Sequence, residues 1–319
     1  EKFGADALRF GLAHLTTATQ DLRIPAEFEC PHCNKLIPQT RDNRSLPRIT
    51  CDGCGQDFST QWAEAEADTA LPRGAVVSDR FELARNFCNK LWNASRFVIM
   101  NLEGYDSAPV ADDELAIEDR WILSRLATVT EGVSEALDRY GYAEAARQLY
   151  DFAWDEFCSF YIEMAKNRMQ DEATRPVAQR VLAHTLDTLM RLLHPMIPFL
   201  TDSVWHHLAA VAPDRGLERP TPAAESIIIA RWPAADAARV DRTTEEQFAL
   251  FQEVLRALRE IRSRQNIAPK TPMTFRVRCD EATAALLAPM QPYFDSMAGA
   301  TSDAWGPDVA DVADDTRMS

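Results

Sequence analysis

Apolar side chains recur at steps of three and four residues along most of the chain, which is the spacing of one face of an α-helix. Similar series lie within residues 122–140, 146–164 and 182–193, and another short helix is expected after the segment "HPMIPF". The pattern therefore predicts antiparallel helices joined by short connections. The clearest series comprises Ala84, Phe87, Leu91, Ala94 and Val98.

The pattern changes in the last third of the chain. A long helix is predicted over residues 243–265, "TPMTFRVRC" alternates as a strand does, and "EATAALLAPMQPYFDSM" indicates a further helix. The segment "SIIIARWP" is short and rich in β-branched residues, so we expect it to be extended. The predicted fold class is mainly α, an antiparallel helical bundle followed by a small α/β unit.

Proline and glycine are concentrated in residues 25–55, where two C-x-x-C pairs are separated by seventeen intervening residues. This spacing is typical of a four-thiolate zinc site. Gly53 and Gly55 suit turn positions with positive φ, and they let backbone N–H groups approach sulfur. Four thiolates fill a tetrahedron and leave no place for substrate, so we expect a structural Zn²⁺ in a small β ribbon. Iron in a similar site and redox use are the alternatives. The candidate ligands are Cys30, Cys33, Cys51 and Cys54.

Two secondary expectations concern the same region and its chemistry. The segments "KLIPQ" and "LPRIT" are expected to pair as a hairpin between the two cysteine turns. The remaining cysteines stand alone in apolar patterns and are expected in the core, and His32 is not needed as a ligand. The isolated cysteines are Cys88, Cys158 and Cys279.

The helix after the cysteine segment carries an unusual polar face. At 100° per residue, an aromatic ring falls in the middle of a stripe of amides and one ammonium group. Such a face is typical of a site for single-stranded nucleic acid, where the ring stacks on an unpaired base and the cation meets a phosphate. The alternative is that the ring packs under a loop or a neighbouring helix. The residues are Asn86, Lys90, Asn93 and Phe97.

The long helix near the C-terminal end carries a second basic series. Arg256, Arg259 and Arg262 follow one another at steps of three. A solvated helix face explains this spacing as readily as phosphate contact does.

The composition is that of a folded protein, with 46% hydrophobic and 26% charged residues among 319, enough for about two domains. No apolar run approaches the roughly 20 residues that span a membrane, and no leader sequence is visible. We therefore expect a cytoplasmic protein with reduced cysteines. A formal net charge of −15 argues against general binding of polyanions such as DNA but allows a local basic patch.

Several segments together resemble the anticodon-binding half of a class I aminoacyl-tRNA synthetase of the valyl branch, over nearly the whole chain except about residues 24–77. The forms "NKLWNASRF" and "IRSRQNIAP" are those that point to the valyl branch. The other matching segments are "GADALRF", "WILSRL", "YAEAARQLYDFAWDEFCSFYIEMAK" and "HPMIPFLTDSVW".

The resemblance implies ATP-dependent charging of tRNA with valine, with ATP and Mg²⁺ used by the parent enzyme. The signatures "HIGH" and "KMSKS" do not occur in these 319 residues, so we expect no catalytic residue here and no activity of this piece alone. The implied partners are the tRNA for valine and the catalytic domain of the same synthetase, with neither membrane nor DNA. Lys90 and Phe97 match positions that face the anticodon loop, and Asn86 and Asn93 are weaker candidates.

The resemblance also divides the chain. Residues 1–23 correspond to a remnant of the stem-contact region after the catalytic domain, and residues 24–77 are an inserted zinc ribbon. Residues 78–235 form the anticodon-binding bundle, and residues 236–319 form a C-terminal α/β junction domain. The ribbon either touches tRNA through its basic residues or only stiffens the connection. These basic residues are Lys35, Arg41, Arg44 and Arg48.

Two other functions are compatible with the sequence. One is a zinc-stapled helical adaptor that binds another protein, which the acidic charge favours. The other is the corresponding region of an isoleucyl- or leucyl-tRNA synthetase.

Overall fold

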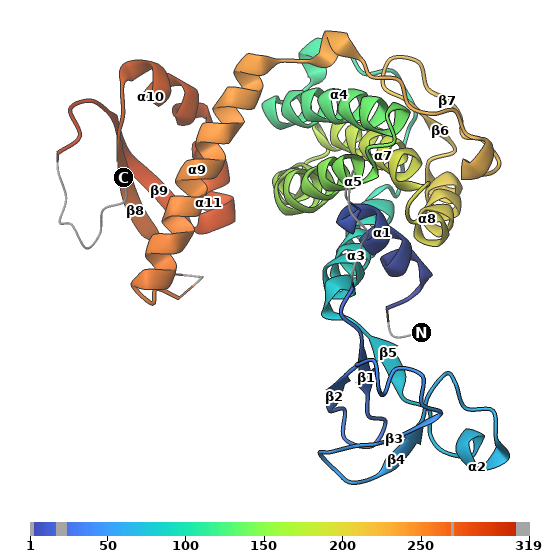
Figure 1. Ribbon diagram of the computed structural model, residues 1–319. Coiled ribbons are helices and arrows are strands. Elements are labelled where there is room, and N and C mark those ends of the chain that lie inside the picture. The colour runs from blue at the N-terminus through green and yellow to red at the C-terminus, as the bar shows by residue number, and fades with distance from the viewer. Residues whose placement is uncertain (1–2, 17–23, 269–270, 311–319) are drawn as a thin grey trace.

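A helical bundle connects two smaller units (Figure 1). One is a small β unit at one end of the molecule, and the other packs against a long helix near the C-terminal end of the chain. The computed structural model describes residues 3–16, 24–268 and 271–310. In these residues no helix is both long and apolar enough to cross a bilayer. The mainly α fold class with an inserted ribbon is confirmed.

The bundle is built from the helices that the apolar series predicted, together with a helix near the start of the chain. Helix α7 is buried on nearly every side, which makes it the centre of the bundle. The first helix, α1, packs on α3, α5 and α8. The helices are α1 (Ala5–Leu15), α3 (Glu82–Asn101), α4 (Ile117–Asp138), α5 (Tyr142–Asp151), α6 (Ile162–Arg168), α7 (Arg175–Leu193) and α8 (Pro198–Val211).

Two details of the bundle follow from local chemistry. The chain between α5 and α6 continues as a π-helical segment, η3 (Phe152–Tyr161). The carboxylate of Asp6 accepts hydrogen bonds from the backbone N–H groups of Phe199 and Leu200, at 3.2 and 2.6 Å, in the first turn of α8. This carboxylate satisfies donors that a helix N-terminus leaves open, so it fixes α1 against α8.

The inserted ribbon consists of two hairpins, each folded across one cysteine pair. Strand β1 (Glu27–Glu29) pairs with β2 (Leu36–Pro38) and also with β5 (Ala75–Val77), which leads into the bundle. Strand β3 (Arg48–Thr50) pairs with β4 (Asp57–Ser59), and a short helix α2 (Glu66–Thr69) follows. The predicted pairing of "KLIPQ" with "LPRIT" is therefore wrong, because each tight cysteine turn returns the chain to the strand just before it.

The C-terminal unit packs on the long helix α9 (Arg242–Arg264), which begins one residue before its predicted start. Strands β8 (Met273–Arg278) and β9 (Ala300–Gly306) are parallel and are joined through α10 (Glu281–Leu287) and α11 (Gln291–Ala298). The single helix predicted over this crossover is interrupted by a 3-10 turn, η6 (Ala288–Met290), that contains a proline.

The segment "SIIIARWP" is not extended as predicted. It forms a 3-10 turn, η4 (Ile227–Ile229), because the side chain of Ser226 accepts a hydrogen bond from the backbone N–H of Ile228 and starts a turn. The remaining short elements connect the larger ones. They are η1 (Asp79–Phe81), η2 (Asp112–Glu114), β6 (Asp214–Arg215), β7 (Thr221–Pro222) and η5 (Ala237–Arg239).

A buried polar network joins the C-terminal unit to the bundle. Arg168 donates hydrogen bonds to Asp119 at 2.6 Å and to Glu118 at 3.2 Å. The hydroxyl of Tyr161 donates to Asp119 at 2.7 Å, and that of Tyr293, from α11, donates to Glu118 at 2.5 Å. Both carboxylates are almost fully buried, so each depends on these donors.

We expect Arg168→Met to lower the free energy of unfolding by about 3–5 kcal/mol, because it leaves two buried carboxylates without their cation. Urea denaturation followed by circular dichroism measures this loss. Arg139→Met is the control, since Arg139 forms an exposed ion pair with Glu144 and its removal should change little.

The same variant has an expected pH dependence. Burial and the neighbouring Asp119 raise the pKa of Glu118. The contribution of Glu118 to the free energy of unfolding is therefore favourable at low pH, and it is lost as the pH rises through the pKa of Glu118 in the folded state. Arg168 opposes this rise in the pKa, so the Arg168→Met variant should lose more stability at pH 8 than at pH 5. An equal loss of stability at both pH values would contradict the idea that the variant leaves Glu118 buried without its cation.

Candidate metal centre and nucleic-acid interface

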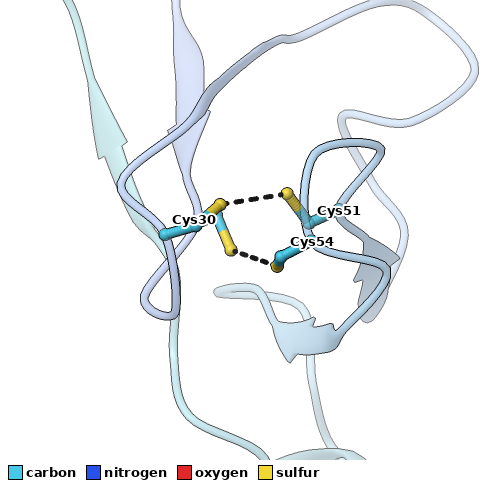
Figure 2. A group of neighbouring side chains, drawn as sticks. Cys30, Cys51 and Cys54 are labelled. Carbon is cyan, nitrogen blue, oxygen red and sulfur yellow. Dashed lines mark hydrogen bonds between the residues drawn. The ribbon is translucent and has the colours of Figure 1, made fainter.

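Four sulfur atoms converge between the two hairpins of the ribbon. The ligand atoms of Cys30, Cys33, Cys51 and Cys54 all lie within 4.8 Å of one another. The sulfurs of Cys30 and Cys54 are 3.7 Å apart, and those of Cys33 and Cys51 are 3.6 Å apart (Figure 2). Four sulfurs at about 2.3 Å from a tetrahedral ion would be about 3.8 Å from one another. The spacing therefore fits a four-thiolate metal site.

The two cysteine turns have the same backbone design. In the first turn the N–H of Cys30 donates to Lys35 O and that of Asn34 donates to Cys30 O, at 3.0 and 2.9 Å. In the second, Cys51 donates to Gln56 O and Gly55 donates to Cys51 O, at 2.9 and 2.8 Å. The residue after each second cysteine is left-handed, with φ of 59° at Asn34 and 72° at Gly55.

One glycine expectation is confirmed and the other is wrong. Gly55 has the predicted positive φ, but Gly53 does not, and Asn34 takes the left-handed position of the other turn. Asparagine tolerates this conformation better than most residues, which is why the sequence needs no glycine there. The expected approach of a backbone N–H to sulfur is confirmed at Gly53, which donates its N–H to the Cys51 sulfur at 3.4 Å.

The surroundings favour a thiolate at Cys51. The backbone N–H of Cys54 is the largest of the causes that together lower the pKa of Cys51 to about 6, with a further contribution from Gly53, while burial opposes them. His32 donates its Nε2–H to the carbonyl of Asp57 at 3.1 Å, so its ring has a partner outside the sulfur cluster. Since a thiolate is the form that binds metal, this backbone geometry prepares the Cys51 sulfur for a cation. Despite opposing backbone hydrogen bonds, burial and the neighbouring thiols raise the pKa of Cys33 and of Cys54, so these two sulfurs would lose their protons when a cation binds.

The remaining cysteines lie outside the cluster. Cys158 is buried, and Cys88 and Cys279 are half-buried. Burial raises the pKa of Cys88 and of Cys158 to about 12, so both stay protonated at neutral pH.

The second candidate site is the polar face of α3, and the structure brings its predicted members onto one helix. Asn86 and Asn93 are exposed, whereas Lys90 and Phe97 are half-buried. The Phe97 ring packs partly on the core, and the ammonium of Lys166 lies 5.6 Å from its centroid. Phe97 is therefore partly packed against the bundle, as the alternative expected, and partly accessible to solvent.

Lys90 is held more tightly than the sequence predicted. Its ammonium donates a hydrogen bond to Ser159 at 2.7 Å and lies 4.0 Å from the ring centroid of Trp154. Burial lowers the pKa of Lys90. Both partners come from η3, whose wide turn lets the Ser159 hydroxyl donate to the carbonyl of Trp154 five residues earlier.

The sequence did not indicate Trp154 or Lys166, which belong to the same surface as Lys90 and Phe97. The helical period places neither of them, because η3 departs from the α-helical repeat between α5 and α6. The stacking of Tyr150 on Trp154, with centroids 5.5 Å apart, holds the indole beside α3.

The basic series on α9 separates into two kinds of residue. Arg256 and Arg259 are exposed, and no ion pair of theirs occurs within the described part of the chain. Arg262 is only 9% exposed and donates to the carbonyls of Ala268, Thr271 and Ala298, at 2.7, 2.8 and 2.7 Å.

The geometry of Arg262 contradicts its expected contact with phosphate. Six residues on an α-helix amount to a turn of about 600°, which places Arg262 about 120° from Arg256 around the axis. That side of α9 faces the C-terminal unit, so this guanidinium holds the loop before β8. The basic residue Lys270 lies outside the described residues.

Comparison with known proteins finds relatives of the chain among tRNA ligases. Residues 119–278 match the anticodon-binding domain of tRNA ligase. A valine–tRNA ligase from Rhodopirellula baltica is 54% identical over all of this chain, ribbon included, and over 31% of its own length. The same enzyme from Bacillus subtilis is 41% identical over 62% of this chain and 21% of its own. The relative from Thermosynechococcus vestitus is 38% identical over 74% of this chain and 26% of its own. The chain thus spans about a third or less of these relatives.

Proposed function

The chain belongs to the family of anticodon-binding domains of tRNA ligases, and from this premise we propose that it binds the anticodon region of the tRNA for valine. The identity of 54% to a valine–tRNA ligase over the whole chain is the observation that carries the proposal, and it favours valine over isoleucine or leucine. The parent enzyme is a valine–tRNA ligase of a reducing compartment such as the cytoplasm. The same identity favours this function over the protein-binding adaptor.

In the parent enzyme this region supplies recognition and not chemistry. The "HIGH" and "KMSKS" signatures that serve ATP and Mg²⁺ do not occur in these 319 residues, so the proposed second partner is the catalytic domain of the same synthetase. We expect the chain by itself to bind tRNA without charging it. Fixing the anticodon arm on a rigid bundle would hold the distant acceptor end in register for that domain.

The polar face of α3 is the proposed contact with the anticodon loop. The accessible part of the Phe97 ring would stack on an unpaired base, and the exposed amide of Asn93, four residues earlier, would read its edge. Asn86 is about 16 Å from Phe97 along α3, so its exposed amide would meet another nucleotide. The hydroxyl that Lys90 now contacts is a neutral acceptor, so an anionic phosphate oxygen would compete well for the same ammonium. Arg256 and Arg259, exposed on α9, are the proposed phosphate contacts of the C-terminal unit.

The four cysteines of the ribbon would hold Zn²⁺ in a structural role. The sulfur spacing and the N–H of Gly53 directed at Cys51 support a closed tetrahedral site with no position for water. The ribbon has a core of its own, separate from that of the bundle, and this core is small. A bound metal would therefore supply much of the ribbon's stability.

Phe97→Leu tests the stacking contact, because leucine keeps apolar packing and removes the ring. We expect the variant to bind the anticodon stem–loop of a valine tRNA about 1–3 kcal/mol more weakly than the unmodified chain. Fluorescence anisotropy with a labelled hairpin measures the affinity, and thermal unfolding checks the fold.

Phe199→Leu is the control for this experiment, since Phe199 is 67% exposed on α8 and outside the proposed face. Its affinity should equal that of the unmodified chain. The proposal fails if Phe97→Leu binds as tightly as the control, or if a valine and an isoleucine hairpin bind equally well.

The metal proposal has a separate test. The purified chain should contain about one zinc per molecule, and Cys51→Ser should lose it, whereas Cys279→Ser should keep it. Chelation should open the ribbon to trypsin at Arg41 and Arg44 without changing the thermal unfolding of the bundle, because the two cores are separate. Iron in place of zinc, or zinc retained by Cys51→Ser, would contradict the assignment.

A further inference from the structure

The ribbon presents a large aromatic ring to solvent in a fixed position. Trp62 follows β4 and is 53% exposed. Its Nε1–H donates to the carbonyl of Arg44 at 2.8 Å, and its backbone N–H donates to the Thr60 hydroxyl at 3.1 Å. Because the polar edge of the indole already has a partner, the surface left open is the ring itself, which is suited to stacking.

The turn that holds this ring is itself fixed by side chains. The N–H of Thr40 donates to Asn43 Oδ1 at 2.7 Å, and Asn43 Nδ2 donates to Pro38 O at 3.0 Å. The Thr60 hydroxyl donates to the carbonyl of Leu46 at 2.5 Å, which ties the turn to the end of β4. A ring held in this way loses little entropy when it binds a partner.

The four basic residues of the ribbon loop divide into two pairs. Lys35 is 3.0 Å from Asp52, and Arg48 is 2.7 Å from Asp68, so these two cations are already neutralised. Arg41 and Arg44 are exposed, and the described residues contain no ion pair for either. The two unneutralised guanidinium groups belong to the same turn that holds Trp62 and outnumber its one carboxylate, Asp42, which gives this surface a preference for an anionic ligand.

The ribbon also lies at a useful distance from the proposed anticodon contact. It joins the bundle just before α3, and it extends away from the foot of that helix (Figure 1). With a rise of about 1.5 Å per residue, Phe97 lies roughly 22 Å along α3 from its first residue. An RNA held at Phe97 would therefore meet the ribbon with nucleotides outside its anticodon loop.

We propose that Trp62, Arg41 and Arg44 form a second RNA contact, in which the indole stacks on an unpaired base and the guanidinium groups bind neighbouring phosphates. The inference rests on the proposed function, since the RNA is the tRNA that α3 would bind. A ring beside unpaired cations favours this ligand over a protein surface, because base stacking and phosphate contact then use both features together.

The test compares a full-length valine tRNA with its isolated anticodon stem–loop, each titrated with the 319-residue chain. We expect Trp62→Ala to weaken binding of the full tRNA roughly 5- to 150-fold and to leave binding of the hairpin unchanged. Trp62→Phe keeps a ring and should retain most of the affinity. Zinc content and circular dichroism establish that each variant is folded.

Matched controls come from the same chain. Trp232 is 41% exposed and also has its indole N–H bonded, to Ser134 at 2.8 Å, so Trp232→Ala should bind both RNAs normally. Arg44→Ala should reduce the slope of log affinity against log salt by about one for the full tRNA. Arg73→Ala removes an exposed arginine of the ribbon outside this turn and should leave the slope unchanged.

The outcomes separate this inference from the function on which it rests. If the unmodified chain binds neither RNA, the proposed function fails and the second contact fails with it. If the chain binds both RNAs but Trp62→Ala matches Trp232→Ala, only the second contact is overturned. The second contact is also overturned if Trp62→Ala abolishes self-association of the chain while its tRNA affinity is unchanged. The ring would then bind a second copy of the chain and not RNA.

Discussion

Helix α3 has to fill the core of the bundle on one side while it leaves a ring and several amides accessible on another. Phe87, Leu91 and Val98 are almost completely buried, and the ring of Phe87 stacks on Phe10 of α1 with centroids 4.6 Å apart. This packing fixes the rotation of α3 about its axis. The direction of its polar face is then set by the core, and a site on a rigid helix keeps its geometry better than a site on a loop.

The acidic balance of the chain makes the position of each cation decisive. Many arginines are used inside the fold: Arg168 holds two buried carboxylates, Arg262 holds backbone carbonyls, and Arg215 lies against Asp187 and the ring of Trp205. These arginines add to the number of basic groups, but their partners inside the fold leave them unable to contact a polyanion. The exposed arginines of α9 and of the ribbon turn are different, and they mark the surfaces where a phosphate chain would gain most.

Periodicity and spacing predicted the features that depend on one local rule. The apolar repeat located the bundle helices, and the paired cysteines located the four-sulfur cluster, because each needs only a fixed interval between like residues. Predictions that depended on the partner of a segment were less successful. Hydrogen bonds that cannot be read from residue spacing determine three of the features that were predicted differently. These are the left-handed Asn34, the capped turn at Ile227–Ile229 and the inward orientation of Arg262.

The neighbours of Lys90 were not found from the sequence, because they too depend on a partner segment and not on residue spacing. A lysine in a row of amides predicts an open cation, but the wide turn of η3 brings the Trp154 ring and the Ser159 hydroxyl against it. The ribbon shows the converse case, since the exposed Trp62 gains its fixed position from the carbonyl of Arg44, in the turn that links the two hairpins. The ribbon has a small core of Phe28, Ile49 and Phe58, drawn from both hairpins, beside its cysteines. Its shape, and with it the position of the indole, would therefore depend on the metal, whereas the face of α3 depends on the bundle alone.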